Sequence, residues 1–112
     1  MSVHWSQLIR DKVLHYYDYV WKNREHYGQR NAPDYAVNSW PPSVPIAVFY
    51  GGNDKLVHPT DAEELIGDIP ERSLVFEKII SPYAHCDFTW GVNAHTNVYN
   101  ETLSLMALYH QL

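Results

Sequence analysis

With 112 residues, the chain has room for at most one domain. Hydrophobic residues make up 46% of it and charged residues only 19%, which excludes an intrinsically disordered chain. The formal net charge of −5, with acidic residues spread along the chain, gives no reason to expect nucleic acid or an anionic membrane as a partner.

Signals for targeting and for redox compartment are sparse. No run of about 18 apolar residues exists, so no transmembrane segment is expected. The N-terminus lacks the basic and apolar regions of a signal peptide, which excludes secretion only if Met1 is the true start. Cys86 is the only cysteine, so an intramolecular disulfide is impossible and the compartment cannot be inferred from cysteine usage.

The first half of the chain has a helical pattern followed by a stretch without one. Apolar residues recur at helical spacing from residue 3 to about residue 20, which predicts an amphipathic helix. The β-branched and aromatic residues from Tyr16 to Trp21 favour an earlier end, near Asp11. Residues 22–45 have no period and contain four prolines, so we expect a connecting loop there.

The second half alternates strand and helix patterns. Ile46–Tyr50 is continuously apolar and ends in Gly-Gly, which predicts a buried strand. Thr60 and Glu63 have the spacing of a capping box, so a short helix should run from there to Gly67.

Leu74–Ile80 is a second predicted strand, and residues 94–111 carry the apolar stripe of a final helix. A strand, a helix and a strand in this order form a right-handed crossover with parallel strands. Two parallel strands do not close a core, and they leave unpaired backbone groups at the edge. We therefore expect an incomplete sheet, the C-terminal part of a larger α/β domain.

Two chemically active residues follow these strands. In open α/β sheets, functional side chains gather beyond the carboxyl ends of the strands, where Asp54 and His85 are both expected. Strand, Asp, helix, strand, His is the second half of the α/β-hydrolase order, in which the nucleophilic Ser precedes the acid and the acid precedes His. Taken singly, an Asp in such a loop is more often a helix cap or a solvated side chain, and a single histidine is more often structural, so only their joint order favours the pair.

Several motifs together resemble one family. These are Phe49-Tyr-Gly-Gly-Asn-Asp-Lys-Leu56, His85-Cys-Asp-Phe-Thr-Trp-Gly91, Ser2-Val-His-Trp-Ser-Gln7, His26-Tyr-Gly-Gln29 with Pro33 and Tyr35, and Val44-Pro45. In this order they resemble the acid lipase family of gastric and lysosomal lipases, whose segments read G-G-N-D-x-L and N-H-x-D-F-x-W-G. The resemblance covers nearly the whole chain and favours a first helix that ends near Asp11.

The resemblance implies a serine esterase of the α/β-hydrolase fold that acts on neutral lipids, such as triacylglycerols or cholesteryl esters. Asp54 would be the triad acid, His85 the general base, and Asp87 a structural anchor of the His85 loop. Residues 1–21 would end the lid region, 22–45 would be the connecting loop, and 46–112 would hold the last two strands and their helices. No cofactor is implied. Full-length members are expected to be secreted or to reside in the lysosomal or endomembrane lumen.

The chain departs from the family pattern in two ways. Ala84 replaces the usual Asn before the histidine, Cys86 stands where Leu is common, and Asn31-Ala-Pro33 replaces the first proline of P-P. More importantly, no G-x-S-x-G and no glycine-rich oxyanion loop occurs, so the chain has an acid and a base without a nucleophile. We expect either a gene-model fragment or a natural short product.

Other residues carry weaker signals. Cys86 beside His85 suggests a Cys-His pair, but neighbours in an extended loop point in opposite directions, so we expect a packed thiol. His58, His85, His95 and Asp87 match no zinc spacing, so no metal site is expected. Asn100-Glu-Thr102 is a glycosylation sequon.

Two further interpretations concern surfaces. The aromatic residues around Tyr16–Trp21 are either a lipid-facing patch or, as we favour, a surface that packs against residues outside this sequence. The alternative to an enzyme part is a non-catalytic interaction protein that docks on another protein through its open sheet edge.

Overall fold

The computed structural model of the chain describes residues 3–110. Between Ala36 and Val37 the chain divides into two units. The division falls inside the stretch 22–45 that we expected to be a single connecting loop.

The first unit begins with helix α1 (Val3–Asp11). Its end at Asp11 confirms the shorter of the two expected helices. The next residue, Lys12, has a φ of +54°, and a left-handed backbone there ends the helix. A 3₁₀ turn follows at Val20–Lys22.

The expectation of a loop from residue 22 onward is wrong at its start, where helix α2 spans Asn23–Tyr27. Gly28 ends the helix with a φ of +69°, and its amide N–H donates to the carbonyl oxygen of Arg24 at 3.0 Å. A helix of five residues is too short to produce a readable apolar period, which is why the sequence pattern concealed it. A further 3₁₀ turn at Val37–Ser39 interrupts the remainder.

The aromatic residues of this unit pack on one another. The ring centroids of Tyr16 and Tyr35 lie 4.4 Å apart, and the ring of Tyr19 stacks on His26 at 3.6 Å. Trp21 remains 83% exposed. The rings of the cluster therefore contact one another while Tyr16, Tyr19 and Tyr35 stay partly exposed, and Trp21 is the most exposed of them.

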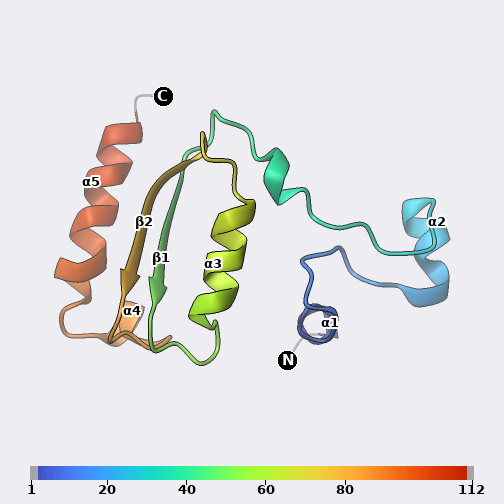
Figure 1. Ribbon diagram of the computed structural model, residues 1–112, viewed down its shortest axis with the longest axis horizontal. Helices are drawn as coiled ribbons and strands as arrows, with labels where there is room; N and C mark the ends of the chain where they lie inside the picture. Colours follow the sequence, from blue (N-terminus) through green and yellow to red (C-terminus); the bar gives the residue numbers. More distant parts are fainter. Residues whose placement is uncertain (1–2, 111–112) are drawn as a thin grey trace. The chain divides into compact units, whose positions relative to one another are not determined.

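The second unit is built on two parallel strands, β1 (Ile46–Gly51) and β2 (Leu74–Ile80), which confirms both expected strands. Both end at the same edge, with their arrowheads side by side in Figure 1. Helix α3 (Pro59–Asp68) joins them and lies beside β1, while α5 (Asn100–Tyr109) lies on the other side of the strand pair. The unit is thus a partial α/β fold.

Helix α3 differs at both ends from the helix that the capping box at Thr60 and Glu63 predicted. The residue at its N-cap is His58, whose Nδ1 accepts a hydrogen bond from the Thr60 amide at 3.3 Å. Pro59 then takes the first helical position, where its missing N–H is not needed. The helix continues past Gly67 to Asp68. It ends there because Ile69, the residue before Pro70, is restricted to extended backbone.

The segment after β2 contains more structure than expected. A short helix α4 (Asp87–Trp90) follows the His85 position. The final helix, expected over residues 94–111, begins with a π-helical turn at His95–Tyr99 and becomes α-helical in α5. Wider turns of this kind are often found at functional sites.

The core of the second unit is small and lies near the carboxyl ends of the strands. Ile80, Tyr83 and Val98 are buried together, and Phe49 and Phe88 pack against them. This core therefore supports the loops that follow the strands, because it is built partly from those loops.

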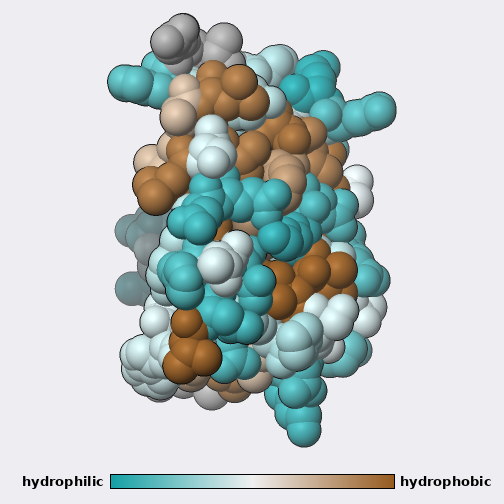
Figure 2. Space-filling view, turned by 90° about the vertical axis from the view of Figure 1, so that its left-hand side faces the viewer, coloured by the Kyte–Doolittle hydropathy of each residue, from teal (hydrophilic) through white to brown (hydrophobic). Residues whose placement is uncertain are grey.

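Many apolar side chains of the second unit lack a cover. On the face that carries α5, apolar groups gather towards the C-terminal end of the helix (Figure 2). Leu103, Met106 and Leu108 are each more than 60% exposed. Polar groups lie between the apolar areas of this face, so the exposed side chains of α5 do not form one continuous apolar patch (Figure 2).

Candidate active site

Asp54 is held by the turn that follows β1. Its Oδ1 accepts hydrogen bonds from the amide N–H groups of Leu56, at 2.8 Å, and Val57, at 3.0 Å. The residue is only 5% exposed. Two backbone donors on one oxygen leave the other carboxylate oxygen, Oδ2, free to accept from a side chain.

His85 is held by the loop between β2 and α4. The Tyr83 amide N–H donates to the Ile80 carbonyl oxygen at 2.9 Å, which turns the chain directly after the strand. Two residues beyond His85, the Oδ2 of Asp87 accepts from the Ala84 amide at 2.7 Å. The carboxylate of Asp87 thus closes the loop across the histidine, and among residues 3–110 the hydrogen bond of the His85 ring goes to Asp54 instead.

Two glycines allow the Asp54 turn and the His85 loop to approach each other. A Cβ atom at Gly51 would clash with the carbonyl oxygen of Tyr83, and one at Gly52 would lie 2.8 Å from the Cα and carbonyl oxygen of Ser81. The amide N–H of Asn53 uses this closeness to donate to the Tyr83 carbonyl at 3.0 Å. The Gly-Gly pair therefore serves close backbone approach, since neither residue has a positive φ.

The two loops bring the acid and the histidine together. The Nδ1 atom of His85 lies 2.9 Å from Oδ2 of Asp54, although 31 residues separate them in sequence. The Asp54 side chain is buried, whereas that of His85 is 51% exposed. The carboxylate therefore lies beneath a ring that remains accessible to another group.

The environment of Asp54 favours its ionised form. Burial raises the pKa of a carboxyl group, but the hydrogen bonds from Val57, Leu56 and His85 outweigh it, and together they hold the pKa of Asp54 below its usual range. An ionised Asp54 accepts from Nδ1–H of a neutral His85, which leaves the lone pair on Nε2. This is the arrangement in which a histidine can take a proton from a nucleophile and remain stabilised as imidazolium.

The environment of Cys86 differs from the packed thiol that we expected. The thiol is exposed, not packed. The physical reason is that Cys86 is not in extended backbone: its φ of −78° and ψ of −12° are helical, and it is the residue that caps α4. The rule that neighbours in an extended loop alternate therefore does not apply to it.

The remaining candidates do not join this pair. Among residues 3–110, no group of three or more His, Cys, Asp or Glu side chains is arranged to hold a metal ion, so His58, His95 and Asp87 form no ligand set there. Asn100 is exposed at the first position of α5. Within the same described range, no helix is both long and apolar enough to cross a membrane.

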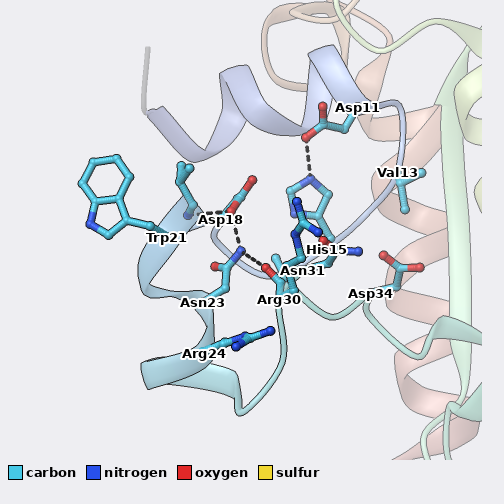
Figure 3. A pocket seen from close by; sticks show the side chains of 12 residues that line it. Asp11, Val13, His15, Asp18, Trp21, Asn23, Arg24, Arg30, Asn31 and Asp34 are labelled. Atoms are coloured by element: carbon cyan, nitrogen blue, oxygen red, sulfur yellow. Dashed lines mark hydrogen bonds and ion pairs between the residues drawn. The ribbon is translucent and has the colours of Figure 1, made fainter.

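The first unit has a hollow of its own, with a volume of about 650 Å³ (Figure 3). Its buried polar residues are already satisfied. The His15 ring pairs with Asp11 at 3.1 Å, and the Asn23 amide donates to Asp18 at 2.7 Å and to the Arg30 carbonyl at 3.0 Å. These contacts hold the turn between α1 and α2 together, and they leave no buried polar group that requires a ligand.

Sequence reasoning did not anticipate the Leu56 and Val57 amides, because backbone donors leave no signature in residue types. It also missed the contacts of the Tyr83 hydroxyl, which donates to Oδ1 of Asn93 at 2.7 Å and accepts from Nδ2 of Asn97 at 3.3 Å. No signal in the sequence separates these asparagines from the others, and Asn97 lies in a π-helical turn that the apolar stripe does not reveal.

No family model matches the chain. It is 38% identical over 107 residues to gastric triacylglycerol lipase of Rattus norvegicus, and 37% identical over 109 residues to lysosomal acid lipase/cholesteryl ester hydrolase of the same species. It is 38% identical over 106 residues to triacylglycerol lipase 2 of Arabidopsis thaliana. These similarities cover 94%, 96% and 88% of the chain respectively.

The same similarities cover only 26%, 26% and 25% of those three lipases, so the chain spans about a quarter of the length of the curated relatives it matches. The geometry defines the class of protein as a partial α/β fold in which an aspartate and a histidine meet beyond the ends of two adjacent strands. The chain belongs to the acid lipase family of gastric and lysosomal lipases, and it corresponds to a C-terminal portion of them.

Proposed function

We propose that this chain provides the acid and the base of a Ser-Asp-His triad in a carboxylic ester hydrolase of neutral lipids. Asp54 is the acid and His85 the general base. The observation that carries the proposal is the 2.9 Å hydrogen bond between Asp54 Oδ2 and His85 Nδ1 beyond the ends of two adjacent parallel strands. On this view β1 and β2 are the last two strands of an α/β-hydrolase sheet.

The chemistry divides between the two side chains. Asp54 holds His85 as the Nδ1–H tautomer and orients its ring. Nε2 then removes the proton from a serine hydroxyl as that oxygen attacks the ester carbonyl, and it later returns the proton to the leaving alkoxide. Asp54 remains ionised throughout and stabilises the imidazolium, in keeping with its lowered pKa.

The nucleophile has to come from a different sequence. None of the five glycines of the chain builds a G-x-S-x-G segment. A base and an acid without an activated nucleophile leave little catalysis, because loss of the serine alone costs on the order of a millionfold in rate. The substrate class proposed here, triacylglycerol or cholesteryl ester, is the one that the names of the related lipases state.

An esterase assay on two proteins tests this proposal. The 112-residue chain and a longer protein that adds a G-x-S-x-G segment upstream are compared with a short-chain ester and with an emulsified triacylglycerol. We expect turnover only in the longer protein. There His85→Ala should abolish it, and Asp54→Asn should lower kcat about 10⁴-fold.

Two controls make the assay specific. His95→Ala removes an exposed histidine of the same unit and should leave turnover unchanged. Cys86→Ser tests the exposed thiol beside His85. Turnover by the 112-residue chain that disappears in Cys86→Ser would contradict the scheme, because it would make the cysteine the nucleophile.

A second candidate function is a non-catalytic interaction protein. It is favoured by the two-stranded sheet, in which the outer edges of β1 and β2 pair with no further strand among residues 3–110. Such an edge can accept a strand from another chain. Stable binding to a partner that requires the β1 edge, together with no effect of His85→Ala in any longer protein, would favour this function over the first.

A further inference from the structure

Tyr83 lies between the two loops that carry the acid and the base. It is only 4% exposed, and it precedes His85 by two residues. Its carbonyl oxygen accepts from the Asn53 amide at 3.0 Å, so its backbone joins the His85 loop to the residue before Asp54. Its ring packs edge to face on Phe88, with centroids 5.3 Å apart.

The hydroxyl group of Tyr83 makes a second set of contacts on the opposite side of the loop. It donates to Oδ1 of Asn93 at 2.7 Å and accepts from Nδ2 of Asn97 at 3.3 Å. Asn97 belongs to the π-helical turn at His95–Tyr99. Tyr99, at the end of that turn, donates from its hydroxyl to the Phe88 carbonyl oxygen at 2.5 Å. The wider turn therefore contacts the His85 loop through Asn97 and helix α4 through Tyr99.

The geometry points to Tyr83 as a positioning residue for His85: we propose that its hydroxyl, held by Asn93 and Asn97, fixes the loop so that His85 Nδ1 stays on Asp54. The ring of His85 is half exposed, and the bond to Asp54 is its one hydrogen bond within residues 3–110. An exposed ring held by a single bond keeps its orientation only if its backbone is held as well. Tyr83 is the residue that ties that backbone both to the Asp54 turn and to the final helix.

The catalytic meaning of this inference rests on the proposed hydrolase function, but the orientation of His85 can be measured without any activity. When His85 is neutral, its bond to Asp54 requires the Nδ1–H tautomer, whereas a free imidazole favours Nε2–H. The ¹⁵N chemical shifts of the two ring nitrogens distinguish the tautomers. In its neutral form, His85 of the wild-type 112-residue chain should show mainly Nδ1–H.

Tyr83→Phe is the first variant to measure. It keeps the ring in the core and removes only the hydroxyl. It thereby removes the bonds to Asn93 and Asn97 together. We expect the ratio of Nδ1–H to Nε2–H at His85 to fall about fivefold, a change equal to the net contribution of a typical hydrogen bond. Tyr50→Phe is the matched control, because Tyr50 is also buried and its hydroxyl donates to Glu77 at 3.0 Å, away from the His85 loop.

A second pair of variants avoids the core altogether. Asn93 is exposed, so its substitution does not disturb packing. Asn93→Ala removes the acceptor of the Tyr83 hydroxyl and should lower the tautomer ratio, whereas Asn93→Asp keeps an acceptor oxygen and should restore it. A merely structural role would lower stability in both Tyr variants and leave the His85 signals unchanged.

The outcomes separate this inference from the proposed function. The positioning role would be overturned if His85 of the wild-type chain showed the tautomer ratio of a free imidazole. It would also be overturned if the ¹⁵N shifts of His85 were the same in wild type and in Tyr83→Phe. In the longer lipase, Tyr83→Phe should lower kcat about fivefold with little change in KM. If Tyr83→Phe changes the His85 tautomer ratio but no longer protein hydrolyses esters, the positioning role stands and the hydrolase function fails. If hydrolysis depends on His85 but Tyr83→Phe leaves the tautomer ratio unchanged, the hydrolase function stands and the positioning role fails.

Discussion

Oδ2 of Asp54 accepts a 2.9 Å hydrogen bond from Nδ1 of His85, while its Oδ1 is occupied by two backbone amides of its own turn. The backbone of its own turn therefore fixes the carboxylate, and the carboxylate in turn orients the imidazole. The side chain of His85 is 51% exposed and that of Asp54 is 5% exposed, so the accessible ring is held by a buried carboxylate.

Asp54 should make the stability of the chain sensitive to acid. Its pKa is lower in the folded chain than in the unfolded one, so the folded state holds this carboxylate ionised more readily. The resulting stabilisation is complete above the unfolded pKa of about 3.9 and is lost as the pH falls through the lower, folded pKa. In denaturant unfolding between about pH 6 and pH 2, Asp54→Asn should flatten the acid limb of the stability curve. Parallel curves for wild type and variant would contradict the prediction.

Gly51 should be intolerant of any side chain. Gly51→Ala places a Cβ against the carbonyl oxygen of Tyr83, and because that contact is to backbone the two loops must separate. We expect a loss of about 1–3 kcal/mol in the free energy of unfolding, together with a changed His85 tautomer ratio. The matched control is Gly67→Ala in α3, where a Cβ meets nothing within 4 Å. It should instead stabilise the chain by about 0.5–1 kcal/mol, because alanine is the better helix former. Equal losses at both glycines would contradict the close-approach argument.

The strands were predictable because burial left a direct pattern. Ile46–Tyr50 and Leu74–Ile80 are short apolar runs between turn residues, and both appear as β1 and β2 with the expected parallel pairing. Asp54 and His85 then followed from their places after the strands. The order of elements was therefore enough to predict that the side chains of Asp54 and His85 lie close together.

The parts that escaped prediction depend on backbone geometry instead of residue pattern. Helix α2 and helix α4 have five and four residues, too few for a period. The helical backbone at Cys86 exposed a thiol that an extended loop would have packed. Asn97 donates to the Tyr83 hydroxyl from within a π-helical turn, and no spacing rule for a regular helix anticipates such a turn.

Asp87 should affect turnover by holding the backbone of the His85 loop and not by contacting the His85 ring. Its Oδ2 accepts from the Ala84 amide at 2.7 Å, and an asparagine keeps an oxygen that can accept the same bond. In the longer protein with an upstream G-x-S-x-G segment, Asp87→Ala should therefore lower kcat for ester hydrolysis about tenfold, while Asp87→Asn should lower it much less. Steady-state kinetics with a short-chain ester measure both. Equal and complete inactivation by the two substitutions would instead favour a direct catalytic role for the carboxylate.

Val20 should destabilise the first unit by its backbone conformation. Its φ is +59°, a left-handed conformation that costs a non-glycine residue about 1–2 kcal/mol and is rarer still for a β-branched one. Glycine adopts this conformation freely, although it adds freedom to the unfolded chain that opposes part of the gain. We expect Val20→Gly to raise the free energy of unfolding by up to about 1 kcal/mol in a denaturant titration followed by tyrosine and tryptophan fluorescence. Val13→Gly is the control, since Val13 is also exposed but has no positive φ, and it should be neutral or destabilising. A loss of stability in Val20→Gly that matches the control would mean that the left-handed backbone at Val20 is not under strain.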